Sequence, residues 1–153
     1  MSQAVEGSLE GQGARVALVA SRFNDFVTGK LIAGAQDCLE RHGCAPAVVY
    51  RVPGAWEIPP VVSRLAAAGQ HDAVIALGAL IRGETPHFDV LAHAVTRGLA
   101  RIQLESRIPI IFGILTTDTV EQAIDRAGAK AGNKGWEAAL AAVEMINLYR
   151  RMA

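Results

Sequence analysis

Four short runs of this chain are apolar at nearly every position, and they constrain its fold more than any other feature. They cover residues 15–21, 47–52, 72–81 and 108–115. A strand with one face in water alternates apolar and polar residues, whereas a parallel strand covered on both faces is apolar throughout. The runs therefore predict four strands of a parallel sheet with neither face open to water.

Segments with apolar residues at helical spacing follow these runs. Residues 58–68 open with Pro59 and Pro60 and stop before Gly69, which are typical residues for the first turn and the end of a helix. Thr117 and Asp118 are expected to cap the helix that follows the fourth run. The other helical patterns cover residues 27–39, 88–102, 119–127 and 136–151.

The order βαβαβαβαα predicts an α/β fold, a flavodoxin-like three-layer α/β/α sandwich with a four-stranded parallel sheet. In such a sheet, ligands bind outside the carboxyl ends of the strands at the switch point, which lies between the first and third strands. The segments that follow those strands are residues 21–25 and 82–89, and both carry chemically active side chains. One ligand-binding crevice is therefore expected between them.

The length of 153 residues fits one domain, which we expect to span residues 14–153. Residues 1–13 are polar, with neither a basic nor an apolar signal-peptide region, and they indicate a flexible N-terminal arm. Charged residues make up 20% of the chain, below the usual share of about 25%. Part of the surface is therefore expected to be buried against further copies of the chain.

Charge and cysteine content narrow the possible partners and the compartment. The formal net charge of +0 argues against nucleic acid and anionic membranes as main partners. The longest apolar run, residues 73–81, is too short to span a bilayer. Cys38 and Cys44 show neither CxxC spacing nor a neighbouring His/Cys cluster, so we expect reduced thiols in a cytoplasmic protein and no metal site.

His87 is the best candidate for proton transfer. It lies in the first turn of the helix that follows the third strand, and the ordinary pKa of a histidine side chain is near neutrality. The other histidines have structural alternatives: His42 precedes a helix-ending glycine, His71 lies in the turn before the third strand, and His93 is two turns into its helix. Position therefore favours His87.

The loop that enters this helix is a candidate anion site. Backbone N–H groups of Gly83, Glu84 and Thr85 could hold a phosphate with help from the helix dipole, although Thr85 could equally be an ordinary N-cap. No GxGxxG or GxxxxGK[ST] motif supports a dinucleotide or nucleoside triphosphate site. Arg126 is a second anion candidate, followed by Lys130 and Lys134, with a solvated basic face as the alternative.

Two aromatic residues follow the first two strands. Phe23 and Trp56 could stack on a heterocycle or close the edge of the core, and the low aromatic content of 5% favours stacking. Glu57 offers a carboxylate for the hydroxyl groups of a sugar or polyol, with a helix N-terminal charge as the alternative.

Five motifs in sequence order resemble the lumazine synthase family, which catalyses the penultimate step of riboflavin biosynthesis. The resemblance runs from about residue 14 to 150. The motifs are Phe23-Asn24, the segment GAWEIP at 54–59, GALIRGETPHFD at 78–89, FGILT at 112–116, and QAIDRAG at 122–128 with KAGNKG at 130–135.

The resemblance implies condensation of 5-amino-6-(D-ribitylamino)uracil with 3,4-dihydroxy-2-butanone 4-phosphate to 6,7-dimethyl-8-ribityllumazine, phosphate and water, by an enzyme without metal or organic cofactor. His87 would be the proton donor and acceptor. The implied ribitylaminouracil site comprises Phe23, Ala55, Trp56, Glu57, Ala79, Leu80, Ile81 and, from the neighbouring subunit, Phe112. The implied butanone phosphate site comprises Glu84, Thr85, Arg126 and Lys134.

The resemblance also implies a homopentamer with active sites between adjacent subunits. The compact turn at residues 128–135 is similar to that of members that form icosahedral shells, so we expect pentamers assembled into a shell. A non-catalytic riboflavin- or lumazine-binding protein and a purely structural shell protein remain alternatives. A phospho-receiver domain is excluded, since the required acidic residues are missing after the first strand and at the end of the third.

Overall fold

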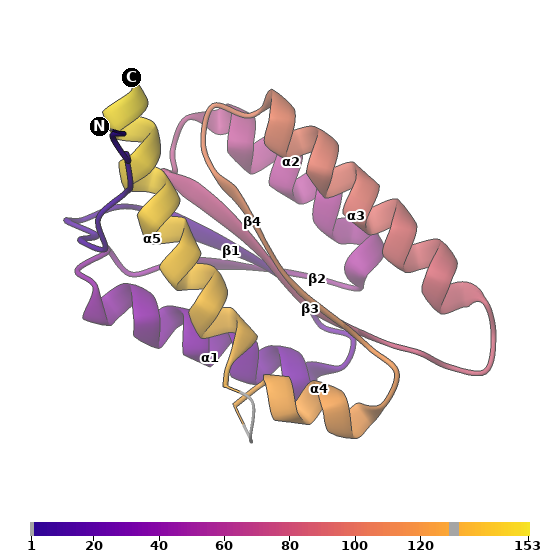
Figure 1. The fold of residues 1–153 in the computed structure, drawn as a ribbon. Coiled ribbons are helices and arrows are strands. Elements are labelled where there is room, and N and C mark those ends of the chain that lie inside the picture. The colour runs from indigo at the N-terminus through magenta and orange to yellow at the C-terminus, as the bar shows by residue number, and fades with distance from the viewer. Residues whose placement is uncertain (1, 129–131) are drawn as a thin grey trace.

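The computed structural model describes residues 2–128 and 132–153, which form a four-stranded parallel sheet between two layers of helices (Figure 1). The strands are β1 (Val16–Ser21), β2 (Val48–Val52), β3 (Ala73–Ile81) and β4 (Ile110–Thr117). They lie in the order β2-β1-β3-β4, and all three pairings are parallel. The predicted α/β sandwich is confirmed, with the switch point between β1 and β3.

Helices α1 (Asp25–Arg41), α4 (Val120–Arg126) and α5 (Lys134–Met152) cover one face of the sheet (Figure 1). Helices α2 (Ile58–Ala68) and α3 (His87–Glu105) cover the other face, after a short 3₁₀ turn η1 (Ala55–Glu57). Successive residues of β1 enter the two cores alternately: Leu18 packs toward α1 and α5, and Val19 toward α2 and α3. This two-sided burial explains why the central strands are apolar throughout.

Strand β2 is less covered than the sequence predicts. It lies at the edge of the sheet, where Val48 is 48% exposed and Arg51 is also exposed. An edge strand contacts a neighbour on one side only, so the two helical layers do not enclose it fully. The expectation that all four strands avoid water on both faces is therefore wrong for β2, and also for the other edge strand, β4, where Phe112 is 40% exposed.

Two element ends also differ from the sequence prediction. Thr119 caps α4, because its hydroxyl oxygen accepts the Gln122 N–H at 3.1 Å, and Thr117 and Asp118 do not cap this helix. Strand β4 starts at Ile110 instead of residue 108, after a turn in which the Ser106 hydroxyl bonds both backbone groups of Ile108.

The N-terminal segment that the sequence predicts to be a flexible arm lies along α5, and the two termini are adjacent (Figure 1). The Asn147 side-chain amide donates to the carbonyl oxygens of Ser8 and Glu10 at 2.8 and 2.9 Å. Arg151 donates to the carbonyl of Glu6 at 2.6 Å. In the described part of the chain, no helix combines the length and the apolar character needed to cross a membrane.

Candidate active site

A crevice of about 570 Å³ opens at the carboxyl ends of β1 and β3, at the predicted switch point. Its walls come from the segment after β1, from η1, from the end of β3 and from the first two turns of α3. Nine of the predicted site residues line it: Phe23, Ala55, Trp56, Glu57, Ala79, Leu80, Ile81, Thr85 and His87.

Phe23 and Trp56 form the aromatic part of the crevice wall. Their side chains are 69% and 65% exposed, so neither ring closes the edge of the core. Two exposed aromatic rings at one cavity provide flat apolar surfaces on which a planar ring can stack. The structure therefore favours the stacking interpretation over the structural one.

Asn24 and Glu57 brace the crevice through hydrogen bonds. The Asn24 side-chain amide donates to the Ala79 carbonyl at 2.8 Å, and its backbone is left-handed at φ 61°, a conformation that asparagine tolerates. The Glu57 carboxylate accepts the Gly54 N–H at 3.0 Å. Glu57 thus stabilises the η1 turn and also lines the cavity, so both of its sequence interpretations are compatible with the structure.

His87 is the first residue of α3 and is exposed at the crevice. The N-cap residue is Pro86, with no side-chain cap, so Thr85 is not the N-cap. The Thr85 hydroxyl still accepts the His87 N–H at a long 3.4 Å. Together with the helix dipole, the weakly satisfied N–H groups of this first turn favour an anion at this end of the crevice.

The remaining predicted residues lie elsewhere in the chain. Phe112, Arg126 and Lys134 line a second pocket of about 500 Å³, together with Ile114, Leu115, Thr116 and Glu137. Glu84 is exposed and does not line the crevice. Lys130 lies outside the described residues. Within one chain, the crevice and the second pocket are therefore separate, and each holds only part of the predicted substrate contacts.

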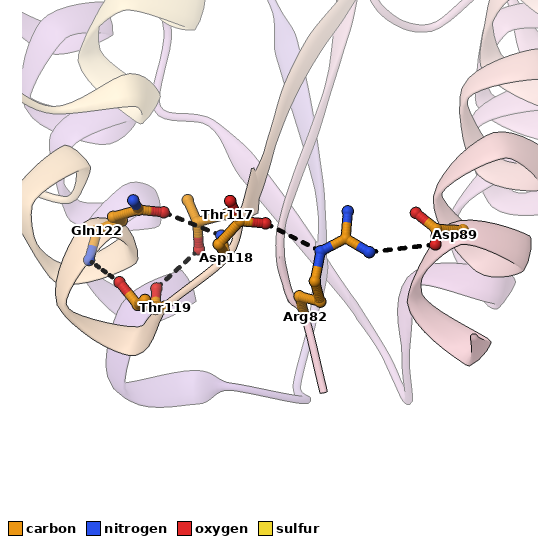
Figure 2. Close-up of polar contacts among 6 residues, drawn as sticks. All are labelled: Arg82, Asp89, Thr117, Asp118, Thr119 and Gln122. Carbon is orange, nitrogen blue, oxygen red and sulfur yellow. Dashed lines mark hydrogen bonds and ion pairs between the residues drawn. The ribbon is translucent and has the colours of Figure 1, made fainter. Parts of the chain in front are cut away.

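Arg82, at the start of the loop that leads to His87, is a residue to which the sequence assigned no role. Its guanidinium donates to Asp118 at 2.9 Å and to Asp89 at 3.1 Å (Figure 2). The charged end of Arg82 also lies over the Phe88 ring, 4.5 Å from its centroid. In the sequence, these contacts are indicated only by the acidic residues Asp89 and Asp118, seven and 36 positions after Arg82. Charge alone does not specify which acidic residue an arginine pairs with.

The structure places the other histidines and the cysteines considered in the sequence analysis outside the crevice, apart from His87. His42 ends α1, where its Nδ1 lies 2.7 Å from the Cys38 carbonyl. Burial raises the pKa of the Cys38 thiol to about 11, and burial also raises the pKa of Cys44; both thiols are free. Burial lowers the pKa of His71, whose ring nitrogens lack hydrogen-bond partners in the described structure. Among the described residues, no group of three His, Cys, Asp or Glu side chains is arranged for a metal ion.

Comparisons with known proteins agree with the geometry. The family model of 6,7-dimethyl-8-ribityllumazine synthase matches residues 13–150. The chain is similar to the 6,7-dimethyl-8-ribityllumazine synthase of Chlorobium phaeobacteroides, with 59% identity over 149 residues, 96% of each chain. It is also similar to the enzymes of the same name from Chlorobium chlorochromatii (57% identity, 97% of each chain) and Prosthecochloris aestuarii (54% identity, 97% of this chain and 97% of that one).

Proposed function

We propose that this chain, which belongs to the 6,7-dimethyl-8-ribityllumazine synthase family, holds its two substrates at the crevice, with His87 moving protons between them. The family membership makes the chain a transferase of riboflavin biosynthesis with lumazine synthase activity. The observation that carries the assignment of the site is the convergence of Phe23, Trp56 and His87 on one cavity at the switch point.

The pyrimidine of 5-amino-6-(D-ribitylamino)uracil stacks on Phe23, beside the polar groups of the crevice. Ala55, Trp56 and Glu57 contact the ribityl chain and the ring. Backbone groups of Ala79, Leu80 and Ile81 bind the pyrimidine edge, a role supported by their place at the end of β3 in the crevice wall. One lone pair of the Ala79 carbonyl already accepts the Asn24 amide, which fixes the direction of that carbonyl.

The phosphate of 3,4-dihydroxy-2-butanone 4-phosphate lies against the N–H groups of Glu84 and Thr85, at the N-terminus of α3. The substrate amine attacks the ketone carbonyl and water leaves, which gives an imine; inorganic phosphate then leaves, and ring closure releases water again. Each step moves a proton, and His87 donates and accepts protons beside the reacting atoms. Because the substrate supplies the nucleophile, the protein accelerates the reaction largely by holding both substrates in register.

The second pocket supplies the rest of the site from an adjacent subunit. Arg126 and Lys134 carry the positive charge that a phosphate requires, and Phe112, 40% exposed, offers a further ring. Two complementary half-sites at different places on one chain call for a head-to-tail contact, and such a contact forms a ring where the rotation between neighbours closes. We assign that ring as a homopentamer, and we assign the pentamers to an icosahedral shell.

Exposed apolar side chains support an interface of this kind. Val90 and Leu104 of α3 are largely exposed in the single chain, and such surface is commonly buried in an oligomer. Light scattering at micromolar protein tests the assembly: a particle of many pentamers supports the shell, and a bare pentamer contradicts it.

The free thiols Cys38 and Cys44 are consistent with the reducing cytoplasm, where we place the enzyme.

The activity is tested by mixing purified protein with both substrates and following lumazine absorbance and fluorescence. A rate well above the uncatalysed background that His87→Ala lowers at least about tenfold supports the proposal. His93→Ala is the matched control, because His93 lies on the same helix but does not line the crevice. Tight lumazine or flavin binding with no rate above background would indicate a binding protein instead.

A further inference from the structure

The loop that carries the reactive end of the crevice has little support of its own. Residues 82–87 are all exposed, and a Cβ atom added at Gly83 would meet no other atom within 4 Å. Among the described residues, two hydrogen bonds hold the His87 side of this loop: the His87 N–H donates to the Thr85 hydroxyl at a long 3.4 Å, and the Val90 N–H donates to the Pro86 carbonyl at 3.3 Å. The position of the imidazole therefore depends on what holds the first turn of α3.

Arg82 contacts that first turn twice. Its Nη1 donates to the Asp89 carboxylate at 3.1 Å, and its guanidinium carbon lies 4.5 Å from the centroid of the Phe88 ring. Phe88 and Asp89 directly follow His87, and Phe88 lines the crevice. The Arg82 side chain thus restrains the two residues that follow His87, although Arg82 itself does not line the crevice.

The other side of Arg82 is anchored to β4 and to the turn that follows it. Its backbone N–H extends the ladder to the Thr117 carbonyl at 2.9 Å, and its Nε donates to Asp118 at 2.9 Å. Asp118 is braced in turn, since its N–H donates to the Gln122 side chain at 2.9 Å (Figure 2). The Gln122 N–H donates to Thr119, which completes the cap of α4.

We propose that Arg82 is a positioning residue of the synthase: it joins the first turn of α3 to the β4–α4 turn and so sets the place of His87 and of the loop 83–85. The proposal rests on the proposed function, since it assumes that His87 and this loop face the substrates. Arg82 bridges two carboxylates: its Nε donates to Asp118 and its Nη1 to Asp89, and the planar guanidinium fixes both directions, which a lysine ammonium does not.

Steady-state kinetics of Arg82→Met test the proposal. We expect kcat to fall about ten- to hundredfold, which is the loss expected from a small misplacement of reacting groups. We also expect KM for the butanone phosphate to rise. KM for the ribitylaminouracil should stay unchanged, because Phe23 and Trp56 are held by other segments. Exposed ion pairs contribute little to stability, so Tm should change by less than about 4 °C.

Two further variants separate positioning from direct substrate contact. Asp118→Asn should change kcat and KM in the same direction as Arg82→Met, although Asp118 does not line the crevice, and the double variant should be no worse than Arg82→Met alone. Arg82→Lys, which keeps the charge but loses the fork, should recover only part of the rate. Arg101→Met is the matched control: it removes an exposed arginine–carboxylate pair from helix α3, away from the crevice.

Each contrary result has a distinct meaning. Equal kinetics for Arg82→Met and Arg101→Met, in an enzyme that His87→Ala inactivates, would overturn the positioning role alone. Both KM values shifting together with a large drop in Tm would also overturn it, since that is a general structural defect. Full activity of His87→Ala would overturn the proposed site, and the role of Arg82 with it.

Discussion

The side chains around the crevice differ in how firmly the fold holds them. The Asn24 amide donates to the backbone of β3 at 2.8 Å, and the Glu57 carboxylate accepts a backbone N–H of its own turn at 3.0 Å, so both side chains shape the cavity before any substrate binds. His87, in contrast, is exposed in the first turn of α3 and lines the crevice, where its side chain is accessible to a bound substrate.

Replacing His87 with alanine should lower turnover by about ten- to a thousandfold, within or below the usual range for a general acid–base group. The residual rate reflects the substrates that the crevice still holds in register. The turnover is measured by stopped-flow mixing of the enzyme with both substrates, with lumazine absorbance as the readout. Free imidazole in the buffer should restore part of the loss. Turnover equal to that of the parent protein would remove the role.

Replacing Arg126 with methionine should raise KM for the butanone phosphate by about tenfold or more, since an arginine–phosphate contact is a charge-assisted pair. KM for the ribitylaminouracil should not change. Arg150→Met is the matched control, because Arg150 is an exposed arginine at the other end of the molecule, 3.7 Å from Asp72. An Arg126 variant with the parent KM would contradict the phosphate assignment.

Acid should destabilise the protein through His71. Burial lowers the pKa of His71 in the folded chain below its ordinary value of 6.5, with a further contribution from Arg15 that Asp72 opposes. The unfolded chain therefore binds a proton more readily, so stability is full above pH 6.5 and falls as pH drops through the folded pKa. His71→Phe, which keeps the edge contact with Tyr50 at 6.4 Å, should show a smaller fall in Tm between pH 7 and about pH 5. Equal falls in both proteins would exclude His71 as the cause.

The sequence predicts the residues of the crevice better than the contacts among them. Phe23, Trp56 and His87 follow strand ends, and parallel strands bring such ends together whatever the register. The bond from Asn24 to Ala79 and the pair of Arg82 with Asp118 depend on which strands are neighbours and on how they are aligned. Local patterns do not contain that information.

Among the elements, those with chemical boundary signals are predicted best. Helix α2 spans Ile58–Ala68 as predicted, because proline fits its first turn and Gly69 adopts the left-handed φ of 74° that ends it. The turn η1 was not predicted. Its formation rests on the reach of the Glu57 carboxylate back to the Gly54 N–H, which no periodicity reports.

Asn133 joins three helices, and its loss should destabilise all of them. Its Oδ1 accepts the Trp136 N–H at 2.9 Å as the N-cap of α5, and its Nδ2 donates to the carbonyls of Lys30 in α1 and Ala127 after α4. We expect Asn133→Ala to cost about 2 kcal/mol, the sum of a lost cap and of two lost hydrogen bonds to carbonyls.

Scanning calorimetry should register that loss as a decrease of about 4–8 °C in Tm. Asn147→Ala is the matched control, since the Asn147 amide, within residues 2–128 and 132–153, bonds only the N-terminal segment, and its Tm should change less. Equal decreases for both variants would show that the junction of α1, α4 and α5 does not depend on Asn133.

For the whole molecule, the decisive feature is that one chain carries two incomplete half-sites. The crevice holds the stacking rings and His87, and the second pocket holds Arg126, Lys134 and Phe112. The sequence predicts both sets of residues, but the periodicity of single elements does not reveal that they lie apart in the folded chain. That separation follows from the placement of α4 and α5 against the opposite face of the sheet from α3 (Figure 1).

Two impaired variants should therefore complement each other in a shared oligomer when they are assayed at a butanone phosphate concentration near the parent KM. Coexpressed His87→Ala and Arg126→Met chains form an intact site wherever a chain with His87 meets a neighbour with Arg126. Random assembly gives one half times one half, or about a quarter of the parent sites, in a head-to-tail ring. Coexpression of His87→Ala with Phe23→Ala, both in the crevice half, should restore nothing. The reference for the first pair is a mixture of the two variants that were purified separately and do not exchange subunits. If the coexpressed pair were no more active than this mixture, both half-sites would have to act within one chain. That result would rule out a site between subunits.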